Sequence, residues 1–194
     1  MRHPLLWPVL LAALAACGTD AQLPPAGQPV TQEQITLYAL TNTDVRTPSA
    51  FVLSSVPVVA RTDETSDFDF AFDIGVDSAF GIGTTGDTVA VLMPRGALGF
   101  AADGGLQLST LVYDSIKAAP LNGYEREHPL AVRQGQSLIA AGRLLQCTYQ
   151  IVRPRAMAKL HVDSLDFAER KAIITVVIDP NCGYLSLQPG FPSY

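Results

Sequence analysis

The sequence predicts an all-β protein, either an antiparallel β-sandwich or a partly open barrel, with few or no helices. Short apolar or alternating runs recur along the chain, and Gly, Pro, Asn and Asp, which favour turns, separate them. Regularly spaced short strands with turn residues between them are typical of sandwiches and barrels. Only 31–40 and 137–145 would also suit a helix by propensity. We expect strands within Ile35–Leu40, Phe51–Ala60, Phe68–Val76, Thr88–Met93, Leu106–Val112, Leu138–Tyr149, Ala156–Asp163 and Ala172–Ile178.

The first sixteen residues have the layout of a secretory signal. Arg2 and His3 give a basic start, Leu5–Ala16 is an apolar run of 12 residues, and small residues lead into Cys17. The run is shorter than the roughly 20 apolar residues that span a bilayer. We therefore expect residues 1–16 to be a signal peptide that is removed.

The sequence Leu14-Ala15-Ala16-Cys17 resembles the lipobox of bacterial lipoproteins. The resemblance implies cleavage before Cys17, a thioether-linked diacylglycerol on its sulfur and a further acyl chain on its new amine. Two or more acyl chains hold a protein stably at a membrane. Gly18 stands where an inner-membrane retention signal would have Asp, so we expect a lipid anchor in the outer membrane of the bacterial cell envelope. The alternative is an ordinary cleaved signal that leaves Cys17 as a spare thiol.

Composition bounds what the exported chain can be. Removal of 16 of the 194 residues leaves 178, which suits one domain. Its high hydrophobic content (48%) and low charged content (16%) contradict disorder. The full chain has a net charge of −5, and loss of Arg2 leaves 12 basic against 18 acidic residues, a net charge of −6. A weakly acidic domain is a poor candidate for nucleic acid, which needs a basic surface.

Residues 17–34 are expected to be the lipidated cysteine and a flexible tether. This stretch carries three prolines and has no periodic apolar face. Pro-rich chains extend by about 3.1 Å per residue, so the tether would hold the domain away from the lipid surface. The β-sandwich domain is therefore expected to cover 35–194.

The clearest predicted strand is Phe68–Val76. Its aromatic and aliphatic residues fall on one face because strand side chains alternate, and four carboxylates fall on the other. Calcium takes six to eight oxygen ligands, but Phe72 stands where an EF-hand loop beginning at Asp67 would need Gly, and carboxylates along a strand form a row instead of a cage. We predict a solvated acidic face and no metal site. The four carboxylates are Asp67, Asp69, Asp73 and Asp77.

Gly81–Gly86 has the G-x-G-x-x-G spacing of dinucleotide-binding loops. A strand, Thr88–Met93, follows it, so no helix N-terminus is available to meet a phosphate. We predict a glycine-rich hairpin loop between Phe68–Val76 and Thr88–Met93.

Motifs of catalysis are absent from the sequence. Gly135–Ile139 begins a G-x-S-x-G pattern and lacks its last glycine, and no H-E-x-x-H occurs. Only two histidines follow the leader. His128 lies in a polar loop before Pro129, where we expect it to be exposed, and His161 lies on a strand, on the face opposite Leu160 and Val162. We expect a non-catalytic protein in which each histidine has a structural or surface role.

Cys147 and Cys182 are expected to form a disulfide. Export places them in an oxidising compartment, where an even pair is normally bonded, and Cys17 is taken by lipid. Two thiols without a nearby histidine make a metal site the weaker alternative. The segment between them reads as a strand, a charged reversal at 168–171 and a second strand, tied at its ends.

Two strand patterns resemble those of exported β-rich lipoproteins of the HmuY haem-binding type. They are Asp67–Ile74 and Ala158–Asp163, the latter followed by Ile173–Val177, although Phe68 stands where that family often has Trp. The segment Asp179–Tyr184 is more similar to lipoproteins of soil bacteria. The first resemblance implies a haem carrier, and His128 and His161 are the histidines such a site would use.

We therefore expect a lipid-anchored, non-catalytic binding or structural module with no cofactor. Its partners would be the membrane, through the anchor, and a protein, a glycan or a small ligand, but no nucleic acid. The alternative is a haem or small-ligand carrier that uses His128 and His161. A large pocket lined by both histidines would favour the carrier, and an exposed aromatic patch would favour a protein or glycan partner.

Overall fold

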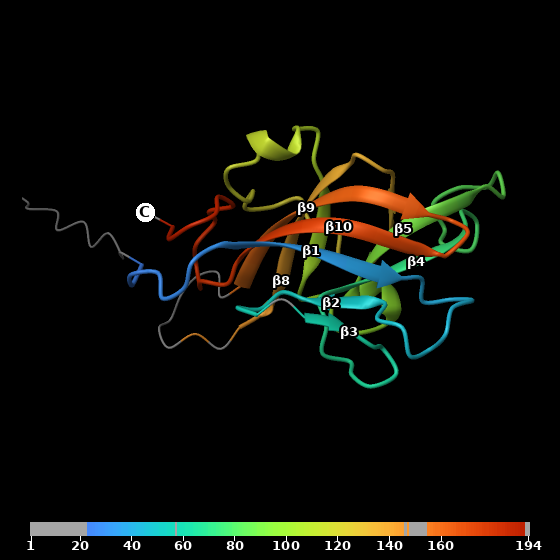
Figure 1. Ribbon diagram of the computed structural model, residues 1–194, viewed down its shortest axis with the longest axis horizontal. Coiled ribbons are helices and arrows are strands. Elements are labelled where there is room, and N and C mark those ends of the chain that lie inside the picture. The colour runs from blue at the N-terminus through green and yellow to red at the C-terminus, as the bar shows by residue number, and fades with distance from the viewer. Residues whose placement is uncertain (1–22, 57, 146, 148–154, 193–194) are drawn as a thin grey trace, which may run out of the picture.

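The computed structural model describes residues 23–192, except 57, 146 and 148–154. Within them, two antiparallel sheets of five strands form an open sandwich, which confirms the predicted all-β class (Figure 1). The first sheet, called the β9 sheet here, has the order β1 (Thr31–Tyr38), β10 (Lys171–Asp179), β9 (Arg155–Asp166), β8 (Ser137–Leu144) and β6 (Gly105–Leu108). The second, the β4 sheet, has the order β3 (Val58–Ala60), β2 (Ala50–Val52), β4 (Phe70–Val76), β5 (Thr88–Pro94) and β7 (Leu130–Val132).

Helical structure is limited to two short 3-10 helices among the described residues, η1 (Arg95–Leu98) and η2 (Tyr113–Ser115). The two segments that also suited a helix are the strands β1 and β8. No helix of the described residues is long and apolar enough to cross a membrane.

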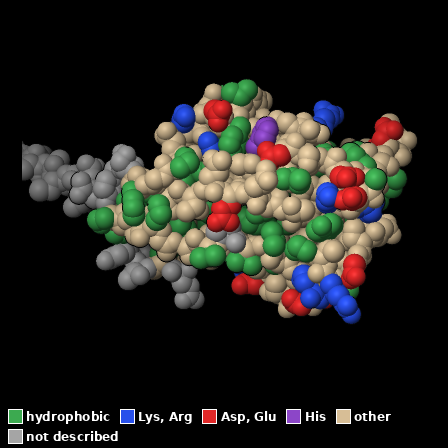
Figure 2. Space-filling model, in the orientation of Figure 1, with side chains coloured by type: hydrophobic (Ala, Val, Ile, Leu, Met, Phe, Trp, Pro, Cys, Tyr) green, Lys and Arg blue, Asp and Glu red, His purple; other side chains and the backbone are tan. Residues whose placement is uncertain are grey.

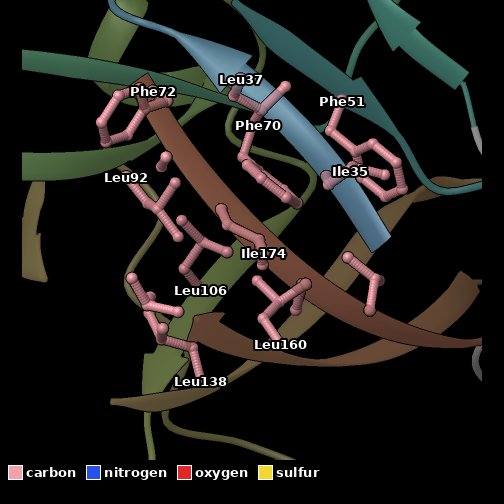
Figure 3. Close-up of a cluster of buried hydrophobic side chains, with 14 of the residues drawn as sticks. Ile35, Leu37, Phe51, Phe70, Phe72, Leu92, Leu106, Leu138, Leu160 and Ile174 are labelled. Atoms are coloured by element: carbon pink, nitrogen blue, oxygen red, sulfur yellow. The ribbon is translucent and has the colours of Figure 1, made fainter. Parts of the chain in front are cut away.

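The core lies between the inner faces of the two sheets. Alternation along β4 points Phe70, Phe72 and Ile74 inward, where they pack in one cluster with side chains such as Leu160 and Ile174 of the β9 sheet (Figure 3). These side chains are fully buried. Burial of one such side chain stabilises a fold by about 1.5 to 3 kcal/mol, so this cluster holds the sheets together.

The hairpin of β9 and β10 forms the middle of the β9 sheet. Its turn covers residues 167–170, and Arg170 adopts a left-handed conformation with φ 53°. The pairing steps from Ile173–Ser164 to Ile174–Val162, so Asp163 is the extra residue of a β-bulge. The strand, reversal and strand predicted between the two cysteines are confirmed.

The first strand begins four residues before Ile35, where the domain was expected to start. β1 begins at Thr31 and pairs with β10 along its whole length, and Val30 exchanges backbone hydrogen bonds with Gly190. Farther back, the Pro24 carbonyl accepts a hydrogen bond of 2.9 Å from the Tyr184 hydroxyl. Residues 32–34 are polar because β1 is an edge strand whose side chains reach solvent, while its backbone still pairs.

Other strand limits also differ from the prediction. The run 51–60 contains two strands, β2 and β3, and the strand expected over 106–112 ends at Leu108. β7 was not predicted, because three residues after Pro129 give too short an alternating pattern.

The first and last described segments lie together at one end of the sandwich. Residues 23–30 contact the C-terminal segment there, and Figure 1 shows this end opposite the long loop between β4 and β5. Gln28 and Asn181 add a mutual pair of hydrogen bonds, N to Oδ1 at 3.0 Å and Nδ2 to O at 2.8 Å. We call this end the terminal end.

Candidate functional site

The acidic residues of β4 do not form a solvated face, which corrects the prediction. Asp69, Asp73 and Asp77 are each at most 5% exposed, while Asp67 remains on the surface. Alternation does place them opposite Phe70 and Phe72, but other chain segments cover that side of the strand. Each buried carboxylate accepts hydrogen bonds from one or two of these segments, so the row ties loops to the sheet.

Asp69 connects β4 to two distant parts of the chain. Its carboxylate accepts hydrogen bonds from the backbone N–H of Leu53 at 2.6 Å and of Arg143 at 2.7 Å, and from Arg143 Nε at 3.3 Å. Burial raises the pKa of Asp69 to about 6, although the two backbone N–H groups and the charge of Arg95 oppose this shift. Arg143 also pairs with Asp67.

Asp73 and Asp77 secure two loops at the other end of β4. Asp73 accepts hydrogen bonds of 3.0 Å from both the backbone N–H and the hydroxyl of Thr41. Asp77 accepts from the backbone N–H of Thr85 at 3.0 Å and of Gly86 at 2.9 Å. A Cβ at Gly83 would lie 2.1 Å from the Asp77 carboxylate, so only glycine fits there.

The glycine-rich segment is a hairpin loop, as predicted. Val76 pairs with Thr88 across it, and the loop carboxylate of Asp77 binds the chain's own backbone. Among the described residues, no group of three or more His, Cys, Asp or Glu side chains is arranged to hold a metal ion.

The Cys147–Cys182 disulfide is confirmed. The two Cα atoms are 6.3 Å apart, within the span that a disulfide bridges. Asn181, next to Cys182, donates from its backbone N–H at 2.9 Å and its side-chain amide at 2.7 Å to the buried Asp179 carboxylate. The bond thus fixes the C-terminal segment at the terminal end. Cys17, the predicted lipidation site, lies outside the described residues.

His128 lies in an exposed turn, as predicted, with its side chain 74% exposed. The Glu125 carboxylate accepts hydrogen bonds from the backbone N–H groups of Arg126, Glu127 and His128, and lies 3.1 Å from His128 Nδ1. Hydrogen bonds from the Glu127 backbone and the His128 ring lower the pKa of Glu125 to about 2. His128 therefore helps to close this turn through its contacts with Glu125.

His161 lies on the outer face of β9, away from Leu160 and Val162, as predicted. Its ring centroid is 5.4 Å from that of Tyr113, and its Nδ1 is buried without a partner among the described residues. Ser137 is its neighbour on β8, but no hydrogen bond between the two side chains occurs in the described structure. The pair therefore lacks the contact that activates a serine nucleophile.

The structure does not bring the two histidines into one pocket. His128 precedes β7 of the β4 sheet, whereas His161 belongs to the β9 sheet, and neither lines the four hollows that are described below. A bis-histidine haem site needs two imidazoles that face each other across the iron.

We expect haem titration of the protein to give no saturable, red-shifted Soret band. His161→Ala should leave the titration unchanged, because neither imidazole faces a hydrophobic slot. The measurement is difference absorbance at increasing haem concentration, with free haem in buffer as the control. A one-to-one complex that disappears in both His128→Ala and His161→Ala would contradict this expectation.

The outer face of the β9 sheet carries a feature that the sequence did not predict. Residues 109–121 and the C-terminal segment cover this face and bury a second apolar cluster against it, which comprises Ile116, Ala119, Ile139, Ala141, Met157 and Leu187. Lys159 projects from β9 and donates hydrogen bonds to the carbonyls of Tyr113 at 3.3 Å and Ile116 at 3.1 Å, which holds the covering segment down.

Three of these four hollows border this covering segment. Two are hollows of about 440 and 410 Å³ that share Lys117 and Ala118. The third, of about 160 Å³, is lined by Pro120, Leu121, Tyr124, Arg126, Ala141, Arg155, Met157 and Leu185. The fourth, of about 270 Å³, lies between the β5–β7 edge and Phe167.

The 160 Å³ cavity is the one that combines an apolar floor with paired positive charge. Ala141 and Met157 are register partners on β8 and β9, and both are 5% exposed. Arg155, two residues before Met157, projects from the same face of β9, and Arg126 approaches from the Glu125 turn. These residues were not predicted from the sequence, although outward-facing apolar positions such as Ile139 and Met157 indicate a strand covered on both faces.

Surface charge on the face drawn in Figure 2 is mixed. On the face drawn in Figure 2, Lys and Arg side chains are interspersed with Asp and Glu among the described residues. A site for a charged ligand would therefore depend on local pairs such as Arg126 and Arg155 rather than on an extended patch.

The fold and these hollows define the protein as a two-sheet, all-β sandwich with a covered outer face. Comparison with models of known families finds no match for the chain, and comparison with curated proteins finds no significant similarity. The function is therefore inferred from its own residues.

Proposed function

We propose that the protein is an exported, lipid-anchored binding module of the bacterial cell envelope that works without catalysis. The anchor would be Cys17, in the sequence that resembles a lipobox, and the anchored face would be the terminal end, where residues 23–30 contact the sandwich. The outer membrane is the proposed location because Gly18 follows the cysteine.

The observation that carries the binding role is the covered outer face of the β9 sheet. Two sheets suffice for a sandwich core, so the additional segment 109–121 is not needed to bury the inner faces. It instead creates hollows that border a buried apolar cluster, and one of them contains two arginines. Concave sites with an apolar lining and a few polar groups are typical of small-ligand binding.

Non-catalytic function is supported by the chemistry of the groups that could react. His161 has no hydrogen bond from Ser137, and the buried carboxylates of Asp69, Asp73 and Asp77 accept hydrogen bonds from the protein's own loops. A nucleophile, a base and an orienting group in mutual contact would be expected of an enzyme of the serine type.

Replacement of the anchor residue tests the cellular part of the proposal. We expect Cys17→Ser to prevent lipid attachment and to move the protein from the detergent phase to the aqueous phase in a detergent partition assay. Mass spectrometry of the wild type should show an N-terminal cysteine with acyl chains. Cys182→Ser is the matched control, because it removes a different cysteine and should leave partition unchanged. An unmodified chain that begins at another residue would refute the anchor.

A further inference from the structure

We propose that the cavity between Arg126 and Arg155 binds a carboxylate attached to an apolar group of about the size of a benzene ring. The inference deepens the proposed binding function, and rests on it, by naming the ligand class. Both a free organic acid and the C-terminal residue of a peptide carry this chemistry.

Arg155 is held in position by the protein and keeps donors for a ligand. Its Nη1 donates a hydrogen bond of 2.9 Å to the Gly142 carbonyl, which fixes the guanidinium at the cavity wall. A guanidinium has five N–H donors, so four remain. Neither Arg155 nor Arg126 forms an ion pair with any described residue. Two such groups suit the planar, bidentate recognition of a carboxylate.

The cavity leaves positive charge without full compensation. Burial, and then the charge of Arg126, lower the pKa of Arg155, whereas Asp103 and Asp69 oppose this effect. Asp69 already accepts hydrogen bonds from Arg143 and the backbone. An anion between Arg126 and Arg155 would relieve the repulsion between them, because opposite charges within a few ångströms attract strongly in a partly buried site.

The Glu125 turn presents Arg126. Glu125 exchanges two backbone hydrogen bonds with Leu106 of β6, at 2.9 and 2.7 Å, and its carboxylate closes the turn that follows. Gly105 permits this close approach, because a Cβ there would lie 2.8 Å from Tyr124 Cβ and 2.9 Å from the Glu125 carbonyl. The backbone of Arg126 is thus fixed although its side chain reaches the surface.

The apolar part of the cavity sets the size of the ligand. Met157, Ala141 and Leu185 line it, and the Tyr124 ring forms a wall because its hydroxyl donates to the Pro120 carbonyl at 2.8 Å. The volume of about 160 Å³ is close to that of an apolar cavity of roughly 150 Å³ known to hold benzene. A long acyl chain would not fit, whereas a phenyl or a branched group of similar size would.

The test uses the full-length chain with carbon-13 in its methionine methyl groups. Titration with phenylacetate should shift the methyl signal of Met157, which lines the cavity, and leave that of Met93 on β5 unchanged. Phenylacetamide, which has the same shape and no charge, should bind at least about tenfold more weakly, because charge-assisted hydrogen bonds would be lost. A tripeptide Gly-Gly-Phe and its C-terminal amide separate the two sources of the carboxylate.

Substitutions of arginine test which residue recognises the carboxylate. Arg126→Gln should weaken phenylacetate binding at least about tenfold, and because Arg126 is exposed the variant should fold. Arg133→Gln, an exposed arginine near the 270 Å³ hollow, is the matched control and should bind as the wild type does. Binding of the free acid alone assigns the site to small acids, and binding of the tripeptide acid assigns it to peptide ends.

Three results would overturn the proposal: no shift of the Met157 methyl by phenylacetate or by the tripeptide, equal binding of phenylacetamide, or equal weakening by Arg133→Gln. The lipid on Cys17 is measured separately by mass. A lipidated chain without a Met157 shift would therefore refute the ligand class and leave the proposed envelope role standing.

Discussion

Reduction of the Cys147–Cys182 disulfide is expected to lower the free energy of unfolding by about 3 to 4 kcal/mol. The two cysteines are 35 residues apart, and closing a loop of that length lowers the entropy of the unfolded chain and so raises its free energy by about this much. The loop contains β9 and β10, the middle of the β9 sheet, so the cross-link restrains the strands that the other elements of this sheet pair with.

The loss of stability is also expected to be greatest at the terminal end. Cys182 follows Asn181, whose side chain bonds to Gln28, and Gly190 pairs with Val30. Without the disulfide, the C-terminal segment loses its covalent tie to the chain after β8, and its contacts with residues 23–30 are expected to weaken. Hydrogen exchange in 23–30 and 181–190 should therefore increase more than exchange in β4.

Urea unfolding with and without reductant measures the change, and Cys182→Ser should reproduce it in the absence of reductant. Cys17→Ser is the control, because Cys17 is not part of the bond and its replacement should leave the midpoint unchanged. A reduced protein that unfolds at the same urea concentration as the oxidised one would contradict the expectation.

Local patterns were sufficient to predict much of the fold. In Phe68–Val76, apolar and polar residues alternate because successive side chains of a strand point to opposite faces. The structure confirms that Phe70, Phe72 and Ile74 enter the core. The hairpin loop at Gly81–Gly86 was predicted because a strand, and not a helix, comes after it. The expected export, and the two cysteines that remain once Cys17 is set aside, predicted the disulfide without any geometry.

Long-range contacts explain what the sequence did not predict. Asp69 is buried because Leu53 and Arg143 bond to it, and Arg143 is 74 residues away. Alternation identifies the face of a side chain but not the segment that covers that face. The same limit applies to the cavity, because Arg126 and Arg155 meet only after β6, β8 and β9 pair.

The two histidines show how a residue type can mislead. The presence of only two histidines after residue 16 suggests a shared ligand set, yet His128 stabilises a turn through Glu125 and His161 contacts Tyr113. The arginine pair gave no such signal, because single arginines in loops and at strand ends are ordinary surface residues.

Arg143→Met is expected to lower the free energy of unfolding by about 3 kcal/mol near neutral pH. The substitution removes the side-chain donor to Asp69, which is 4% exposed, and so leaves a buried carboxylate with less compensation. The aliphatic part of the side chain is preserved by Met. Arg61→Met is the matched control: Arg61 pairs with Asp63 and Glu64 on the surface, where such pairs contribute less than about 1 kcal/mol.

The dependence of this loss on pH identifies charge as its cause. Burial raises the pKa of Asp69 from 3.8 to about 6, so the folded state binds a proton more tightly than the unfolded state. The stability that protonation contributes is fully present below about pH 3.8 and is lost as pH rises through about 6, and a shift of this size corresponds to about 3 kcal/mol. Below about pH 6 the Asp69 carboxyl is neutral in the folded state. The difference in the free energy of unfolding between the wild type and Arg143→Met should therefore become smaller.

The measurement is the urea midpoint between about pH 4 and 7.5 for the wild type, Arg143→Met and Asp69→Asn. Asp69→Asn carries no titrating group at this position, so its stability should lack the change between about pH 4 and 6 that the wild type shows. If Arg143→Met is destabilised equally at about pH 7.5 and about pH 5, its effect comes from lost packing, and the buried charge of Asp69 is not what Arg143 stabilises.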